Sequence, residues 1–75
     1  MPSIEQSGGS SIITALLTPD IDLEADDAEE LVYANWQEIQ DAVAMAGRTN
    51  DPAVGVNATI LLPAGTLYAA APPTL

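Results

Sequence analysis

One segment of the 75-residue chain, Asp26–Ala46, repeats apolar residues at helical spacing along its whole length, and the rest of so short a chain must fold against it. Acidic residues fill its first turn, and Gly47 with Arg48 follows its last, which is typical of helix termini. At about 100° per residue, one stripe collects Ala28, Val32, Trp36, Ile39, Val43 and Ala46. We therefore predict one α-helix whose core residues are Val32, Trp36, Ile39 and Val43.

Trp36 is the single tryptophan of the chain and the largest side chain of this stripe. We interpret it as the central side chain of the core. The alternative is an anchor in an interface, where tryptophan is enriched.

Three further segments predict β-strands. Ser11–Leu17 is rich in β-branched residues and leucine, and Val54–Leu62 alternates apolar and polar residues. A tight turn at Leu62–Gly65 then leads into Thr66–Ala71 as a third strand. The predicted fold class is α+β, a small β-α-β-β domain with one helix packed on a short three-stranded sheet.

The two ends of the chain predict extended arms around this domain. The first ten residues contain Ser7-Gly8-Gly9-Ser10 and no apolar periodicity, so we expect a flexible amino-terminal arm over residues 1–10. The domain is expected over residues 11–71, and a carboxy-terminal tail over residues 72–75.

One helix can cover only one face of such a sheet. The other face should then show an uncharged, apolar patch, which on a small protein indicates a contact surface. We expect its interface residues to be Ile13, Leu17, Leu61 and Tyr68.

The charge of the chain excludes several classes of partner. The formal net charge is −10, with Arg48 as the one basic residue, so phosphate groups would find almost no cations and nucleic acid is excluded as a partner. The apolar run Ile12–Leu17 is too short to span a bilayer of about 30 Å, so no membrane association is expected. Residues 6–19 and 52–75 carry no charged side chain.

The residue types available argue against an enzyme. The chain has no cysteine, histidine or lysine, so nucleophile–base pairs and structural zinc sites cannot be built, and no cofactor is expected. Asp20, Asp22, Glu24 and Asp26 alternate as in a calcium loop. However, the sixth position of that loop would be Ala25 instead of glycine, and the twelfth would be leucine instead of an acid. We therefore expect no metal site.

A core of this size supplies only about 3–5 kcal/mol, so a homo-oligomer or a protein partner is expected to add stability. In layout, the arm Pro2–Ser11 and the segment Ile60–Tyr68 resemble small decoration, or cement, proteins of tailed-bacteriophage capsids. The resemblance implies a non-enzymatic structural subunit that docks on a capsid protein by its apolar sheet face and arms. It also implies a location on the virion surface, where an acidic chain is kept away from packaged nucleic acid.

Two alternatives remain open from the sequence. The first is an acidic regulator, such as a nucleic-acid mimic or an antitoxin-like protein, which would block a basic site on a partner through Asp20 to Glu30. The second is a salt-adapted free monomer, which the missing lysines and the excess of acids would suit.

Overall fold

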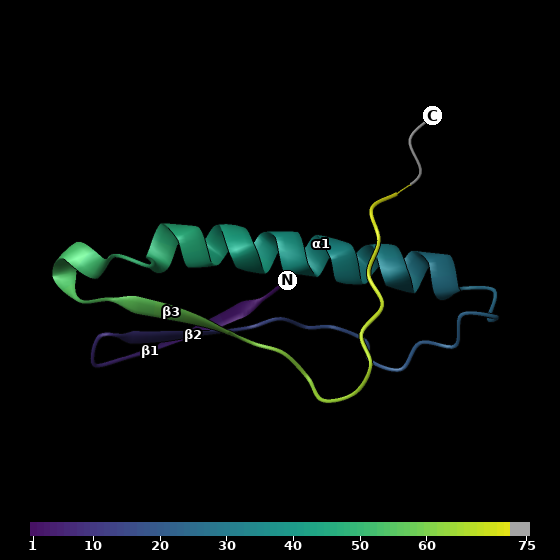
Figure 1. The fold of residues 1–75 in the computed structure, drawn as a ribbon, viewed down its shortest axis with the longest axis horizontal. Coiled ribbons are helices and arrows are strands. Elements are labelled where there is room, and N and C mark those ends of the chain that lie inside the picture. Colours follow the sequence, from purple (N-terminus) through teal and green to yellow (C-terminus); the bar gives the residue numbers. More distant parts are fainter. Residues whose placement is uncertain (73–75) are drawn as a thin grey trace.

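The computed structural model describes residues 1–72 and confirms the predicted fold class, a small α+β fold with one helix packed against a three-stranded sheet (Figure 1). Residues 73–75 of the predicted tail lie outside the described residues. The elements, in chain order, are β1 (Ser3–Ser7), β2 (Ser10–Thr14), α1 (Ala28–Thr49), the 3₁₀ turn η1 (Pro52–Val54) and β3 (Asn57–Leu61).

The segment expected to be a flexible arm contains strand β1. It pairs antiparallel with β2 through a two-residue loop, Gly8-Gly9, whose φ angles are 53° and 88°. Positive φ at both loop residues is the geometry that joins two strands without splaying them. The element order is therefore β-β-α-β, with the additional strand at the amino terminus instead of the carboxyl terminus.

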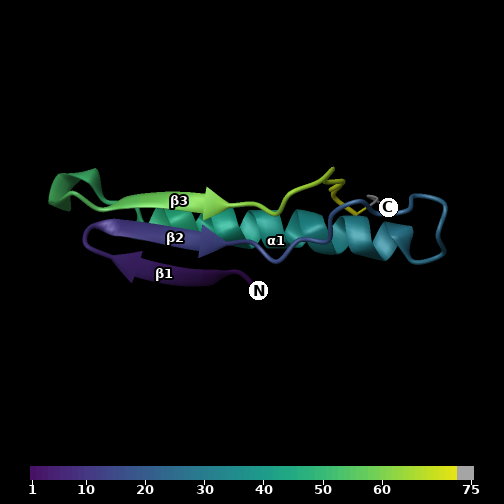
Figure 2. The same cartoon turned by 90° about the horizontal axis from the view of Figure 1, so that it is seen from below.

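Strands β2 and β3 are parallel neighbours, and α1 connects them across one face of the sheet (Figure 2). Their register pairs Ile13 with Ile60, and both side chains belong to the face that α1 covers. The pairing extends one step further, because the Ala15 N–H donates to the Leu61 carbonyl at 3.3 Å. The sheet order is β1-β2-β3, so β1 and β3 form its two edges.

The third strand predicted over Thr66–Ala71 is not formed. After β3 the chain bends at Ala64-Gly65, leaves the sheet and crosses α1, where the Ala70 N–H donates to the Val32 carbonyl at 3.4 Å (Figure 1). Backbone groups that a hairpin would have paired with β3 bond to the helix instead.

The helix begins two residues later and ends three residues later than the sequence predicted. Asp27 is its N-cap residue but makes no capping bond with its side chain, and the helix continues through Gly47 to the C-cap Asn50. Gly47 does not have a positive φ angle, so it is an ordinary helical residue and does not end the helix.

The apolar core is small and contains several alanines. Its buried centre is formed by Ile13, which is fully buried, with Ala15 and Ala42. Small side chains on both layers let α1 lie close to the sheet. Five half-buried residues complete this cluster: Leu17, Met45, Ala46, Ala58 and Ile60.

The predicted core residues are corrected by this arrangement. The helix buries Ala28, Asn35 and Ala42, a face rotated by roughly 70° from the mean direction of the four predicted core residues at about 100° per residue. None of the four predicted residues belongs to the cluster around Ile13. Val43 is 55% exposed, and Val32, Trp36 and Ile39 are half-buried. The apolar periodicity did not identify this buried face, because the face carries alanines and two polar residues. Hydrogen bonds stabilise those two residues, Asn35 and Glu38, in their inward positions.

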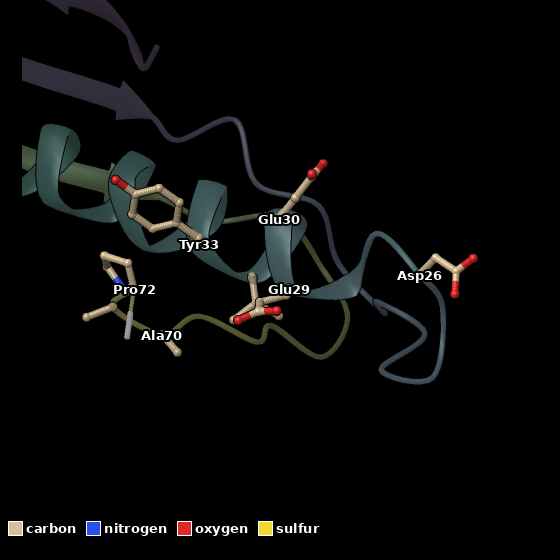
Figure 3. A pocket seen from close by; sticks show the side chains of 8 residues that line it. Asp26, Glu29, Glu30, Tyr33, Ala70 and Pro72 are labelled. Carbon is tan, nitrogen blue, oxygen red and sulfur yellow. The ribbon is translucent and has the colours of Figure 1, made fainter. Parts of the chain in front are cut away.

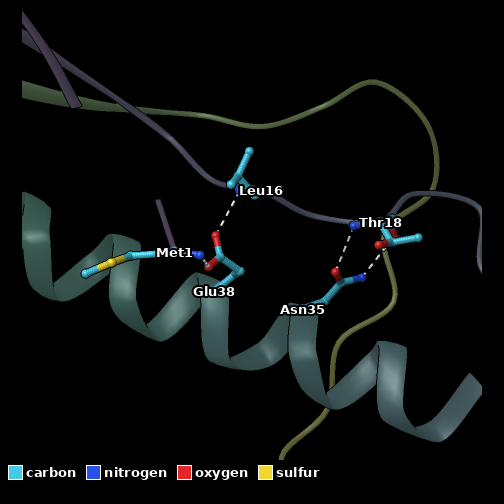
Figure 4. A network of polar contacts seen from close by, with 5 residues as sticks. All are labelled: Met1, Leu16, Thr18, Asn35 and Glu38. Atoms are coloured by element: carbon cyan, nitrogen blue, oxygen red, sulfur yellow. Dashed lines mark hydrogen bonds and ion pairs between the residues drawn. The ribbon is translucent and has the colours of Figure 1, made fainter. Parts of the chain in front are cut away.

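Asn35 is the first of these polar residues and acts as a clamp (Figure 4). Its Oδ1 accepts a hydrogen bond from the Thr18 N–H at 2.9 Å, and its Nδ2 donates to the Thr18 carbonyl at 2.9 Å. The same Nδ2 donates to the Tyr68 carbonyl at 3.0 Å. One buried amide thus ties the segments after β2 and after β3 to the middle of the helix.

A second contact joins the same two segments. The Asp20 N–H donates to the Thr66 carbonyl at 2.8 Å, and the Thr66 N–H donates back to Asp20 Oδ1 at 3.0 Å. Gly65, with φ at 112°, lies so close that a Cβ atom there would meet Asp20 Oδ2 at 2.7 Å and Pro19 Cβ at 3.1 Å. This position requires glycine.

Replacing Asn35 with alanine should lower the free energy of unfolding by about 2–4 kcal/mol, because three backbone groups lose their partner in a buried place. Gln37→Ala, on the exposed side of the same helix, is the matched control and should change stability by less than about 0.5 kcal/mol. Urea unfolding followed by circular dichroism measures both. Equal effects of the two substitutions would contradict the clamp.

The two glycines should respond in opposite directions to alanine. Gly47→Ala should raise the free energy of unfolding by about 0.5–1 kcal/mol, because the glycine is helical and a Cβ atom meets nothing within 4 Å. Gly65→Ala should lower it by about 1–3 kcal/mol through backbone strain and the contact with Pro19. Thermal unfolding of both variants checks the signs, and a stabilising Gly65→Ala would be inconsistent with this geometry.

Candidate functional site

An apolar hollow of about 240 Å³ lies where the parallel strands β2 and β3 end. Three leucines around it are more than half exposed: Leu16 at 63%, Leu61 at 54% and Leu62 at 52%. None of the seven lining residues is charged. They are Thr14, Ala15, Leu16, Leu17, Leu61, Leu62 and Pro63.

The strand face that points away from α1 continues this surface. Side chains alternate along a strand, so the register that buries Ile13 and Ile60 turns Ile12, Thr59 and Leu61 outward. The outward positions of β2 and β3 are mostly hydroxyl or amide residues, and Glu5 on β1, opposite Ile12, adds one acid. The apolar part of the open face is therefore concentrated at the hollow.

The structure brings together two of the four predicted interface residues. Leu17 and Leu61 line the hollow. Ile13 is fully buried beneath α1 and belongs to the core, so its predicted place on the open face is wrong. The run Ser11–Leu17 is largely apolar on both faces, and its pattern therefore does not indicate which face meets the helix. Tyr68 is partly exposed but does not line the hollow.

The sequence did contain a signal for the hollow. Leu61 and Leu62 are consecutive, and two adjacent leucines at the end of an alternating strand cannot both face the core. Ile13 and Ala15, the odd-numbered residues of this segment, are buried. Leu16 therefore faces outward and extends the hollow.

Glu38 holds the backbone of the hollow's rim in place (Figure 4). Its Oε2 accepts a hydrogen bond from the Leu16 N–H at 2.9 Å, and its Oε1 pairs with the amino-terminal ammonium of Met1. The ammonium, followed by the Leu16 N–H, lowers the pKa of this carboxyl, and burial opposes the shift. Glu38 is thus an anionic anchor that α1 extends toward the segment carrying Leu16.

A second depression, an acidic groove of about 520 Å³, lies beside the start of α1 (Figure 3). The helix contributes Glu29, Glu30 and Tyr33, Asp26 lies just before the helix, and the chain after Tyr68 forms the other wall. The full lining consists of Asp26, Glu29, Glu30, Val32, Tyr33, Ala70, Ala71 and Pro72.

Two carboxylates of the acidic segment before α1 accept hydrogen bonds from backbone N–H groups, one within the segment and one after β3. Asp22 Oδ1 accepts a hydrogen bond from the Glu24 N–H at 3.1 Å, and Asp20 Oδ1 accepts from Thr66 as described above. Within residues 1–72 no three acidic side chains converge as ligands for a metal ion. The same residues contain no helix with the length and apolarity needed to cross a bilayer.

Comparisons of the chain with protein-family models, with curated proteins and with solved structures found no match. The chemistry of the two depressions is therefore the basis for assigning a function.

The lowered pKa of Glu38 predicts a pH-dependent contribution to stability. Because the folded pKa lies below the ordinary value of 4.5, the contribution is complete above that value and is lost as the pH falls through the folded pKa. The difference in unfolding free energy between the wild type and Glu38→Gln should therefore shrink between neutral and strongly acidic pH.

Urea titrations of both proteins at a series of pH values measure this difference. Acetylation of the amino terminus is the matched control, because it removes the ammonium that is the main cause of the shift. A difference that grows on acidification would show that Glu38 is not held as an anion.

Proposed function

We propose that this chain is a non-enzymatic structural subunit that docks on a larger protein assembly through the apolar hollow at the end of β2 and β3. The observation that supports this proposal is the chemistry of the hollow. Its three leucines are more than half exposed, and no charged residue lines it. Such a surface is stabilised by a complementary apolar partner and gains little from water.

The shape of the molecule adds support. Its extents are 46 × 29 × 15 Å and its radius of gyration is 14.4 Å, whereas a compact chain of this length would have about 11 Å. Its accessible surface of 5220 Å² exceeds the roughly 4,300 Å² of a compact monomer of this size. A thin plate with surplus surface suits a protein that lies on another one.

The assembly we propose is a virus shell, with this chain as a decoration or cement protein on its outer side. A chain with a net charge of −10 is repelled by packaged nucleic acid and tolerated on the outside. Clamping neighbouring shell subunits requires contact surfaces and no catalytic group.

The acidic groove supports a second candidate function. Its three carboxylates, with Tyr33 beside them, suit a basic segment of a partner, as in an acidic regulator that blocks a cationic site. The two functions use different surfaces, so substitutions can separate them.

Leu61→Asp should abolish docking under the first proposal, because it places a charge in an interface that excludes water. The measurement is co-sedimentation of the purified chain with isolated shells of the virus or other assembly whose genes lie beside its own. Leu61 is already exposed, so circular dichroism should show an unchanged fold.

The matched control neutralises the groove with Glu29→Gln and Glu30→Gln. Under the first proposal this variant should co-sediment as the wild type does. Loss of binding in this variant alone, together with binding that weakens as salt is added, would favour the acidic regulator and contradict docking through the hollow.

A further inference from the structure

Strand β3 is an edge of the sheet, and alternate peptide groups along it point away from β2. The Asn57 N–H donates to the Gly9 carbonyl, and the Leu61 carbonyl accepts from the Ala15 N–H, so these groups point toward β2. In a trans peptide the C=O and the next N–H point in opposite directions, and no peptide in residues 1–72 is cis. The N–H that follows the Leu61 carbonyl therefore points outward.

The amino-terminal half of this outer edge is already bonded. Val56 exchanges two hydrogen bonds of 2.9 Å with Asp51, and the Ala58 N–H donates to Asn50 Oδ1 at 3.1 Å. The segment that leads out of α1 thus covers the edge as far as Ala58.

The carboxy-terminal half of the edge is open. Its outward groups are the Ala58 C=O, the Ile60 N–H and C=O, and the Leu62 N–H, and none of them bonds another group in the part of the chain that the structure describes. Charged side chains and proline normally protect a free edge, yet β3 contains neither. The opposite edge strand, β1, does carry the acidic residue Glu5 and follows Pro2.

The flank of α1 on the same side of the molecule is apolar. At about 100° per residue, Glu38 lies about 60° to one side of the buried Asn35, whereas Ile39 and Val43 lie about 40° and 80° to the other side. Glu38 pairs with the ammonium of Met1, just before β1, so its side of the helix is that of β1. Ile39 and Val43 therefore lie on the side of β3 (Figure 2).

This flank lies at the level of the open edge. Val43 is 55% exposed and follows Ala42, which packs in the same cluster as Ile60. The chain that leaves β3 crosses α1 only at Val32, about 16 Å along the helix from Val43 at about 1.5 Å per residue (Figure 1). We call the open half of the edge, together with Ile39 and Val43, the β3 edge site.

We infer that the partner in the proposed docking function contributes an extended, uncharged segment that pairs with the β3 edge site as a fourth strand. An extended backbone supplies the alternating donors and acceptors that such an edge lacks. Side chains of the added strand would alternate, so one set would cover Leu61 beside the hollow and the other would lie under Val43. The inference rests on the proposed function, because Leu61 and Leu62 belong to both the hollow and this edge.

A second copy of the chain fits the edge less well. The symmetric pairing that uses all four open groups is antiparallel about Ile60, and it would place Leu62 of one copy beside Ala58 of the other. Asn50 already occupies that place, since its side chain bonds the Ala58 N–H. Two copies, each with a net charge of −10, also repel each other.

Leu62→Pro tests the backbone contact, because proline removes the outward N–H and no bond to β2. Its binding to the shells of the docking test should be at least about tenfold weaker than that of Leu62→Ala, since a hydrogen bond and the close approach of the strand are lost. Leu62→Ala is the matched control, because it keeps the N–H and removes more of the side chain. Co-sedimentation measures binding, and circular dichroism should show an unchanged fold in both variants.

Amide hydrogen exchange supplies the second measurement. The Ile60 and Leu62 amides should exchange more slowly in the shell-bound wild type than in the free chain, because the added strand bonds or covers them. The amides of the Gly8-Gly9 loop, at the other end of the sheet, are the control and should not change.

The outcomes separate this inference from the docking function. Equal binding of Leu62→Pro and Leu62→Ala, or unprotected Ile60 and Leu62 amides in the bound wild type, would overturn the added strand, while loss of binding in Leu61→Asp would still support docking. A wild type that does not co-sediment would overturn both. Protection of the two amides in the isolated chain, with the mass of a dimer in sedimentation equilibrium, would assign the edge to a second copy and overturn the inference.

Discussion

The arrangement of this protein depends on the buried amide of Asn35. Regular pairing of the sheet ends at Thr14 and Leu61, yet the chain continues from both points along the helix. The apolar cluster is too small to hold these continuations, because its fully buried centre has only three residues. Asn35 holds both by bonding the backbone at Thr18 and at Tyr68, so a polar contact supplies what apolar packing does not.

This clamp also determines where apolar surface remains. With Asn35, Glu38 and Ala42 turned toward the sheet, the larger side chains of the helix are rotated to its flank. The clamp and Glu38 likewise fix the backbone near Leu16 in an orientation that exposes its side chain. Both the hollow and the exposure of Val43 on the flank of α1 therefore result from a polar, alanine-containing contact face.

The sequence predicted the helix, two of the strands and the fold class because these depend on local periodicity. It did not predict β1, which is short and polar, although the Gly8-Gly9 loop is a recognised hairpin signal. It placed the core on the wrong side of the helix because Val43 and Trp36 are more apolar than Asn35. Only the hydrogen bonds that Asn35 makes with segments distant in sequence reverse that preference, and periodicity contains no information about them. The sequence also placed Ile13 on the open face, because both sides of its run are apolar.

Charge distribution makes an exposed apolar hollow compatible with a small acidic protein. Two copies of the chain repel each other, because each carries a net charge of −10. Apolar surface alone would therefore associate them weakly and in no fixed orientation. The acids are concentrated at the start of α1 and in the segment before it, whereas the hollow contains none. Contacts that keep the acidic ends apart therefore cost much less electrostatic free energy than contacts that bring them together.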